Sequence, residues 1–336
     1  MRLFRKTAAL VWALLLALSL ASCGGNVSED AETEEEDITV RVAAMKGPTA
    51  MGLVRLMRDA ENSGADLSGT KYAFTLAASP DEVTPLLIQG NLDIACLPAN
   101  LAAVLYNRTE GALVCLAVNT LGVLYIVENG DEIHSVADLA GKTIAASGMG
   151  STPEYALRYL LEQNGLNPDT DVTMDWKSEH SECVAALASG AAAIAMLPQP
   201  FVTVAQNTIE DLRVQLDLTA EWDALDNGSA LITGVAVARR AFVEEHPDAA
   251  EWFLREYADS VDWVNANVAD AAALIGEYDI VAAPVAEKAL PWCNIVCITG
   301  AQMRENLSGY LRVLYDAAPD SVGGALPGDD FYYHGA

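Results

Sequence analysis

The chain has 336 residues, of which 52% are hydrophobic and 20% charged, so it is long enough for two ordinary domains and too apolar for wholesale disorder. Its formal net charge is −28, and it is −31 without residues 1–22, which hold three basic and no acidic side chains. This charge argues against nucleic acid or an anionic membrane surface as a partner, but it permits a small anionic ligand, because helix dipoles and backbone N–H groups act locally.

Residues 1–22 have the pattern of an export signal. Arg2, Arg5 and Lys6 precede the apolar run ALVWALLLALSL, which is short for a membrane span. The run leads into Leu-Ala-Ser followed by Cys23, which resembles a bacterial lipobox, where the cysteine is lipidated and becomes the first residue. We expect a lipid anchor at Cys23, with an ordinary secretory signal as the alternative.

Residues 23–37 continue as an acidic segment, with the sequence GGNVSEDAETEEED after the cysteine. The segment lacks apolar periodicity, so it is expected to be a solvated tether that holds a folded body away from a membrane. Together the signal and the tether predict a protein on the extracytoplasmic face of the cell membrane. We expect it to be a monomer, although the sequence does not determine the oligomeric state.

Strand and helix patterns alternate from residue 38 onward, which predicts an α/β fold with sheets covered by helices on both faces. The first group of strands is expected at 38–45, 72–79, 92–98 and 112–120, with helices at 48–62, 80–90 and 99–109 between them. The rhythm starts again after residues 122–129. A strand, a short helix and a long helix then follow within residues 229–267, with further helical patterns at 270–278 and 301–317.

Two parts of the chain resemble each other. Residues 86–105 align with residues 186–205, and each part runs through a helix, a glycine, a strand, Leu-Pro and a second helix. We therefore predict two similar lobes, with 38–122 and 235–336 forming lobe I and 123–234 forming an inserted lobe II. Because the chain crosses between the lobes twice, the crossings form a hinge, and a cleft between the lobes is the expected ligand site.

The remaining cysteines and histidines do not predict a metal site. Cys96 and Cys115 lie in apolar runs and are expected to be buried, whereas Cys293 and Cys297 are spaced for a possible disulfide. The four histidines are scattered. The turn GMGSTP lacks the lysine of a phosphate-binding loop and the third glycine of a dinucleotide motif. We expect no metal, no cofactor and no catalytic residues, hence no enzyme.

Several stretches together resemble the solute-binding lipoproteins of ABC importers, within the branch that holds nitrate, sulfonate or taurine, and thiamine-precursor binders. The stretches are the lipobox, MKGPTAMGL, ASPDEVTPLLIQGNLDIACLPAN, NTLGVLYIVEN, SVADLAGKTIAASGMGSTPEYALRYLL and ASGAAAIAMLPQPFVT. The resemblance implies a type II periplasmic binding protein fold, in which two lobes, each a mixed sheet flanked by helices, close on a small solute. Delivery to an ABC permease and its ATPase is implied as well. A ligand-sensing lipoprotein and a thiamine-pyrimidine-synthase-like enzyme are the alternatives.

The resemblance also implies ligand contacts from the turns that follow the strands. The implied residues are Gly47, Pro48, Thr49, Ala50, Ser79, Pro80, Asp81, Pro98, Ala99 and Asn100 in lobe I, and Gly150, Ser151, Thr152, Glu179, His180, Pro198 and Gln199 in lobe II. Thr49 and Ser79 can cap helices with their hydroxyls, and Asn100 supplies a neutral amide. Helix capping alone is the alternative role for each of them.

Few cations accompany these turns. Lys46 precedes the first turn and no arginine occurs in the others, so a small polar or anionic organic solute would be held by N–H groups and hydroxyls. An aromatic heterocycle would instead need aromatic walls, although core packing is the alternative role for the candidates. These candidates are Tyr106, Tyr125, Tyr155, Trp176, Phe201 and Trp222.

Overall fold

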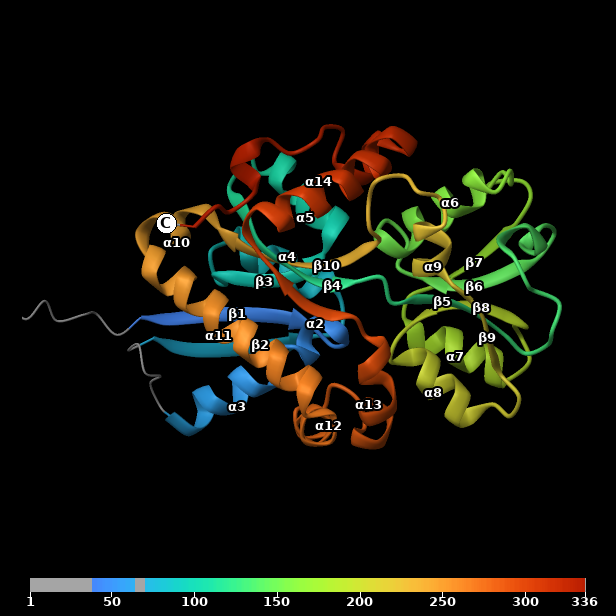
Figure 1. Ribbon diagram of the computed structural model, residues 1–336, viewed down its shortest axis with the longest axis horizontal. Helices are drawn as coiled ribbons and strands as arrows, with labels where there is room; N and C mark the ends of the chain where they lie inside the picture. Colours follow the sequence, from blue (N-terminus) through green and yellow to red (C-terminus); the bar gives the residue numbers. More distant parts are fainter. Residues whose placement is uncertain (1–37, 64–69, 336) are drawn as a thin grey trace, which may run out of the picture. The chain divides into compact units, whose positions relative to one another are not determined.

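The computed structural model describes residues 38–63 and 70–335, which form two mixed sheets covered by helices (Figure 1). The predicted export signal, Cys23 and the acidic tether lie outside the described residues. Among the residues that are described, no helix is both long enough and apolar enough to span a bilayer.

The first sheet, called sheet A, has the strand order β11-β4-β10-β3-β1-β2. β1 pairs in parallel with β2 and β3, β10 is antiparallel to both β3 and β4, and β11 is antiparallel to β4. The strands are β1 (Thr39–Met45), β2 (Lys71–Ala77), β3 (Ile94–Pro98), β4 (Leu113–Leu121), β10 (Ile232–Arg239) and β11 (Ile295–Ile298).

Helices cover both faces of sheet A, because its central strands are apolar on both sides. One face packs against α4 (Pro80–Ile88), α5 (Ala99–Arg108) and α14 (Gly300–Ala317). The other face packs against α2 (Pro48–Met51), α3 (Val54–Ser63), α11 (Pro247–Ala266), α12 (Val268–Glu277) and α13 (Ala283–Ala289). The short helix α10 (Arg240–Glu245) connects β10 to α11.

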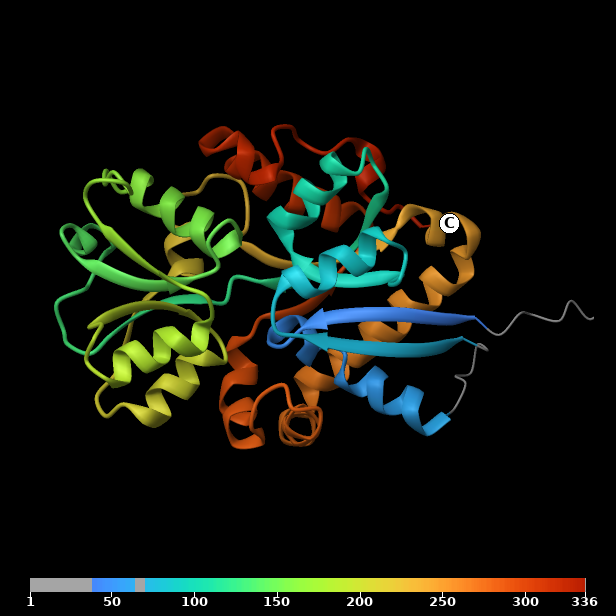
Figure 2. The same ribbon diagram turned by 180° about the vertical axis from the view of Figure 1, so that it is seen from behind.

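The second sheet, called sheet B, has the order β7-β6-β8-β5-β9 and lies entirely between β4 and β10 in the sequence. Its strands are β5 (Leu124–Glu128), β6 (Thr143–Ser147), β7 (Thr173–Lys177), β8 (Ile194–Pro198) and β9 (Arg213–Asp217). α6 (Thr152–Gln163) covers one face, whereas α7 (His180–Ala188) and α8 (Phe201–Thr208) cover the other, as Figure 2 shows from behind. α9 (Leu218–Asp223) leads back toward β10.

The structure differs from the sequence prediction at the segment 48–62, where two helices replace one. The break lies at Gly52, which α11 approaches closely: Ser260 Oγ donates to the Gly52 carbonyl at 2.7 Å, and a Cβ at Gly52 would lie 3.2 Å from Tyr257 Oη. A glycine permits this approach. The short strand β11 and the helices α9 and α13 were not predicted.

The cysteines after position 23 are free in the structure. Cys96 and Cys115 are buried, as predicted from their apolar runs. The spacing of Cys293 and Cys297 allowed a disulfide, but the structure holds both as thiols, and Cys293 Sγ lies 3.9 Å from Met51 Sδ. The carboxyl-terminal segment packs onto sheet A, because Phe331 is buried and the Tyr333 N–H donates to the Cys115 carbonyl at 2.9 Å.

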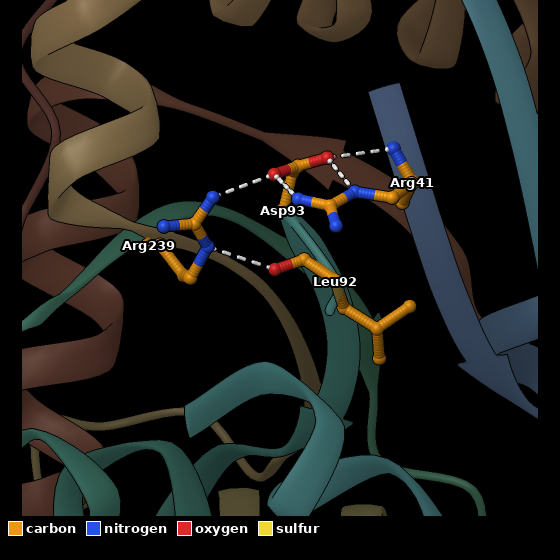
Figure 3. A network of polar contacts seen from close by, with 4 residues as sticks. All are labelled: Arg41, Leu92, Asp93 and Arg239. Atoms are coloured by element: carbon orange, nitrogen blue, oxygen red, sulfur yellow. Dashed lines mark hydrogen bonds and ion pairs between the residues drawn. The ribbon is translucent and has the colours of Figure 1, made fainter. Parts of the chain in front are cut away.

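A charged cluster ties together the amino-terminal ends of β1 and β3 and the carboxyl-terminal end of β10 (Figure 3). The Asp93 side chain is 5% exposed and accepts from Arg41 Nη2 at 2.6 Å and from Arg239 Nη2 at 2.7 Å. Arg239 Nε also donates to the Leu92 carbonyl at 2.9 Å. Burial raises the pKa of Asp93, but the hydrogen bonds from Arg41 and Arg239 outweigh burial and hold that pKa below 3.8.

Candidate functional site

The carboxyl-terminal ends of the parallel strands in the two sheets face each other. The side of each sheet at which these strands end is called its facing edge. β1, β2, β3 and β4 end at one edge of sheet A, and β6, β7, β8 and β9 end at one edge of sheet B. β4 ends at Leu121 and β5 begins at Leu124, opposite Pro198, so a two-residue link joins the two edges. Ligands of open α/β sheets bind at such edges.

Buried polar side chains gather at these facing edges. Buried polar groups need partners, so their concentration in one region needs a local explanation. The edge of sheet A contributes Thr49, Asn100, Asn119 and Thr120, and the edge of sheet B contributes Ser147, Thr152, Gln199 and Thr203, all at most 8% exposed.

Three of the residues predicted to bind ligand contact one another across the two edges. Asn100, in the first turn of α5, accepts from Thr152 Oγ1 at 3.2 Å and donates to the Gly150 carbonyl at 3.4 Å. Its amide also donates to the Ser321 carbonyl at 3.0 Å. Further from this point, Lys288 Nζ on α13 donates to Asn207 Oδ1 on α8 at 2.8 Å. These hydrogen bonds between the two lobes therefore join neutral groups, except that one donor is the Lys288 ammonium.

A corner of the sheet A edge holds a buried amide with an unused donor. Asn119, near the end of β4, is 0% exposed, and its Nδ2 has no hydrogen-bond partner, whereas its Oδ1 accepts from Thr120 Oγ1 at 3.1 Å. The side chain lies between Gly234 and Thr49, since a Cβ at Gly234 would be 2.5 Å from Asn119 Oδ1 and 2.9 Å from Thr49 Cγ2. The Asn119 side chain also lies near the buried Cys96 thiol and Tyr257 hydroxyl, and it counteracts the rise that burial causes in the pKa of each. Nδ2 makes no regular hydrogen bond with either group, and a buried donor of this kind is destabilising unless a ligand or water takes it.

The predicted turn after β1 contains Gly47, Pro48, Thr49 and Ala50, which begin α2. Gly47 is buried and has φ 139°, yet a Cβ built there meets no atom within 4 Å, so there is room beside this backbone. Thr49 lies inside α2 rather than at its cap, and its hydroxyl donates to the Met45 carbonyl at 2.9 Å.

The other predicted residues of lobe I differ in burial. Pro98, Ala99 and Asn100 are buried at the start of α5. Ser79 is the N-cap of α4 and forms a capping box with Glu82, so its hydroxyl and its N–H are both used at the helix end. Helix capping is the alternative role expected for this residue. Pro80 is half-buried beside it, and Asp81 is exposed.

The predicted turn of lobe II begins α6. Ser151 is its N-cap residue, but the hydroxyl donates to the Gly148 carbonyl at 2.8 Å instead of capping. The Gly150 N–H is taken by the carboxylate of Glu154 at 2.7 Å. Thr152 is 1% exposed and bonds to Asn100 as described above.

The turns after β7 and β8 hold the remaining predicted residues. Glu179 is exposed and accepts from Ser181 Oγ at 3.1 Å. Pro198 and Gln199 are buried, and Gln199 Oε1 accepts from Thr203 Oγ1 at 2.9 Å. His180 starts α7, with its ring centroid 5.2 Å from that of Phe201 and its Nδ1 buried without a partner. Burial lowers the pKa of His180 to about 4, so its ring is neutral at neutral pH.

Sequence reasoning missed Asn119, Thr120, Thr203 and Gly234. A signal was present for the first two, because they form a polar pair at the end of the otherwise apolar strand LVCLAVNTL. Of the aromatic candidates, Trp222 is 0% exposed and packs against Tyr159 and Tyr310, which makes it a core residue. Within residues 38–63 and 70–335, no cluster of three or more His, Cys, Asp or Glu side chains is suited to a metal ion.

Residues 65–229 match a family model described as the periplasmic substrate-binding protein of phosphonate ABC transporters. No curated protein sequence matches the chain.

Solved structures share the fold at low sequence identity. An ABC transporter protein from Parabacteroides distasonis is 23% identical, with a TM-score of 0.73 over 88% of this chain and 99% of that one. The periplasmic aliphatic sulphonate binding protein SsuA from Escherichia coli is 18% identical, with a TM-score of 0.69 over 85% and 95% of the two chains. The alkanesulfonate-binding protein SsuA from Xanthomonas axonopodis pv. citri, bound to MOPS, is 17% identical, with a TM-score of 0.65 over 86% and 94%.

In all of these comparisons the chain covers most of the related structure, so the likeness extends over the whole two-sheet body. Residues 65–229 therefore resemble the periplasmic substrate-binding proteins of ABC transporters, and the shared fold, with sheet B inserted between β4 and β10, is the type II binding protein fold.

Proposed function

We propose that this protein captures a small polar solute between the facing edges of sheets A and B and delivers it to an ABC permease. The observation that carries the proposal is the buried polar cluster at those edges, above all the unused Asn119 Nδ2. A solute with hydrogen-bonding groups would take that donor and fill the room beside Gly47.

We further propose that lobe I and lobe II move as units about the two links, at residues 122–123 and 218–231, between the sheets. Solute contacts on both edges favour the closed arrangement, because only that arrangement makes both sets of contacts. The hydrogen bonds that Asn100 donates to the Gly150 carbonyl and accepts from the Thr152 hydroxyl then belong to the closed form, since they join the two edges directly.

The test is a thermal-shift and calorimetric screen of the folded body from residue 38, with alkyl sulfonates, taurine, nitrate, phosphonates, pyrimidines and thiamine. A solute at a hundred times its Kd stabilises the folded state by about 2.7 kcal/mol, which raises Tm by several degrees. The matched variant is Asn119→Leu, which has a side chain of similar size and no polar atoms.

We expect Asn119→Leu to lose solute affinity at least tenfold, because the substitution removes a donor that makes no regular hydrogen bond in the folded protein. Its unfolding free energy should fall by only about 1 kcal/mol, because the Thr120 hydroxyl loses its acceptor. Loss of stability together with unchanged solute affinity would show that Asn119 has a structural role and that the solute binds elsewhere.

We also propose that Cys23 carries the lipid that anchors the protein to the membrane, with the acidic segment 23–37 as a tether. Support comes from the sequence alone, in the order of basic residues, apolar run and Leu-Ala-Ser-Cys. Metabolic labelling with an alkyne analogue of palmitate should mark the wild-type protein and leave Cys23→Ser unmarked. Equal labelling of both would place the lipid on another residue.

A further inference from the structure

Three helices that begin at the facing edges already hold a carboxylate at their amino-terminal ends. Glu82 accepts from the Ala78 N–H at 3.1 Å ahead of α4, Glu154 from the Gly150 N–H at 2.7 Å ahead of α6, and Glu182 from the Ser178 N–H at 2.8 Å ahead of α7. Each glutamate is the third residue of its helix. At α4, α6 and α7 the backbone groups and positive dipole ends that would attract an anionic solute are therefore occupied by the protein's own charge, whereas α2, α5 and α8 begin without an acidic residue in their first turns.

The lysines near these edges are paired as well. Lys46 Nζ, ahead of α2, lies 2.9 Å from Asp279 Oδ2, and Lys177, the last residue of β7, lies 2.9 Å from Asp175 Oδ2. No arginine occurs in the described turns that follow β1, β2, β6, β7 and β8. Lys288, whose Nζ donates to the neutral Asn207 amide at 2.8 Å, lies further away on α13, and Arg158 Nη1 lies 4.0 Å from Glu154 Oε1 on the same helix. An anionic solute beside α4, α6 or α7 would therefore meet a carboxylate before it met a cation.

The groups that remain for a solute are neutral. They include the buried hydroxyl and amide side chains of the cluster, with the unused donor of Asn119 at 0% exposure. His180 is neutral at neutral pH because burial lowers its pKa to about 4. Neutral donors discriminate solutes by hydrogen-bond pattern, and the nearby carboxylates favour a solute that brings an amine.

We propose that the solute of this protein carries no net negative charge and is a neutral or zwitterionic molecule, recognised by the amides and hydroxyls of the facing edges beside the carboxylate of Glu154. This inference rests on the proposed function. The inference distinguishes this chain from two of its structural neighbours, which are sulphonate- and alkanesulfonate-binding proteins.

The decisive variant is Glu154→Gln, which keeps an acceptor oxygen for the Gly150 N–H and removes the charge. Glu162→Gln is the matched control, because it makes the same charge change at an exposed position near the other end of α6. The anionic probes are ethanesulfonate and methylphosphonate, and the zwitterionic and neutral probes are taurine, glycine betaine and a pyrimidine. Calorimetry is carried out at low and at moderate NaCl concentration.

We expect the anionic probes to bind the wild type at least tenfold more weakly than the tightest of the other probes. Glu154→Gln should strengthen anion binding at least fivefold, whereas Glu162→Gln should leave it unchanged. Weak anion binding to the wild type should improve with added salt, because salt screens the repulsion by carboxylates.

Tight binding of ethanesulfonate or methylphosphonate to the wild type, weakening with salt and unchanged in Glu154→Gln, would overturn the inference and leave the proposed function intact. If the neutral and zwitterionic probes bind but Glu154→Gln strengthens anion binding no more than Glu162→Gln does, the role given to Glu154 is wrong. If no probe binds any of the three proteins, the inference and the proposed function both fail.

Discussion

The two ends of sheet A differ in whether their buried polar side chains have hydrogen-bond partners. At one end, two guanidinium groups hold the buried Asp93 carboxylate, and both of its oxygens accept hydrogen bonds (Figure 3). At the other end, the 0%-exposed Asn119 has an unused donor, and room lies beside Gly47. The first arrangement is what stability requires, and the second is what binding requires, because a site must keep groups available for a ligand.

The largest expected effect follows from breaking the charged end. Asp93→Ala leaves the Arg41 and Arg239 guanidinium groups without their shared carboxylate, so the unfolding free energy should fall by about 3 kcal/mol. Solute affinity should not change, because the cluster lies at the edge opposite the proposed site. Urea denaturation and calorimetry measure the two quantities.

The pH dependence of Asp93→Ala provides a second check. The pKa of Asp93 is lower in the folded protein than its ordinary value of 3.8, so its contribution to stability is present above that value and is lost as the pH falls through the folded pKa. The difference between wild type and variant should therefore shrink below about pH 4. Asp131→Ala, which breaks the exposed pair with Arg213, should leave stability almost unchanged. An equal loss in both variants would contradict the stabilising role given to the buried Asp93 carboxylate.

A smaller effect is expected from crowding the neutral end. In Gly234→Ala, the new Cβ would lie 2.5 Å from Asn119 Oδ1, closer than real Cβ atoms approach, so the Asn119 side chain must move. Affinity for the tightest-binding member of the solute panel should fall at least tenfold, with a loss of stability of about 1–2 kcal/mol. Titration calorimetry and thermal melting measure these quantities.

Gly309→Ala is the control for that substitution. A Cβ at Gly309, within α14, would lie 3.5 Å from its nearest neighbour, which is ordinary contact, and alanine favours the helix. We expect unchanged solute affinity and equal or slightly higher stability. If Gly234→Ala also kept full affinity, the corner formed by Asn119 and Thr49 would not belong to the binding site.

The sequence predicts most of the fold because the apolar strands and the amphipathic helices are local features. The repeated order of helix, glycine, strand and Leu-Pro at residues 86–105 and 186–205 indicates two similar lobes before any contact is known. The split of the segment 48–62 could not be predicted, since its cause is the approach of Ser260 and Tyr257 from a helix about 200 residues further along the chain. β11 was not predicted, because a strand of four residues is too short to show a clear periodicity in the sequence.

The site is less predictable than the fold. The strand ends indicate which turns meet, but not which of their groups are already in use. Glu154 occupies the Gly150 N–H, so a turn that reads from the sequence as an open anion site is closed by its own helix. Conversely, Asn119 lies within a strand, and only its position between Gly234 and Thr49 reveals an amide without a partner.

The smallest expected effect concerns His180. This residue begins α7 beside sheet B and, like Asn119, has a buried nitrogen without a hydrogen-bond partner. The pKa of His180 is about 4 in the folded protein and about 6.5 in the unfolded chain, so the unfolded chain takes up the proton first as the pH falls. The unfolding free energy should therefore decrease by about 1 kcal/mol between pH 7 and pH 5.5 on account of this residue, as measured by urea denaturation. His180→Asn should remove that part of the pH dependence, whereas His334→Asn, at an exposed position, should retain it. Solute affinity of the wild type should stay constant over the same range, because the ring keeps its neutral form; a change in affinity that the His180→Asn substitution abolishes would instead mean that the solute binds the protonated ring.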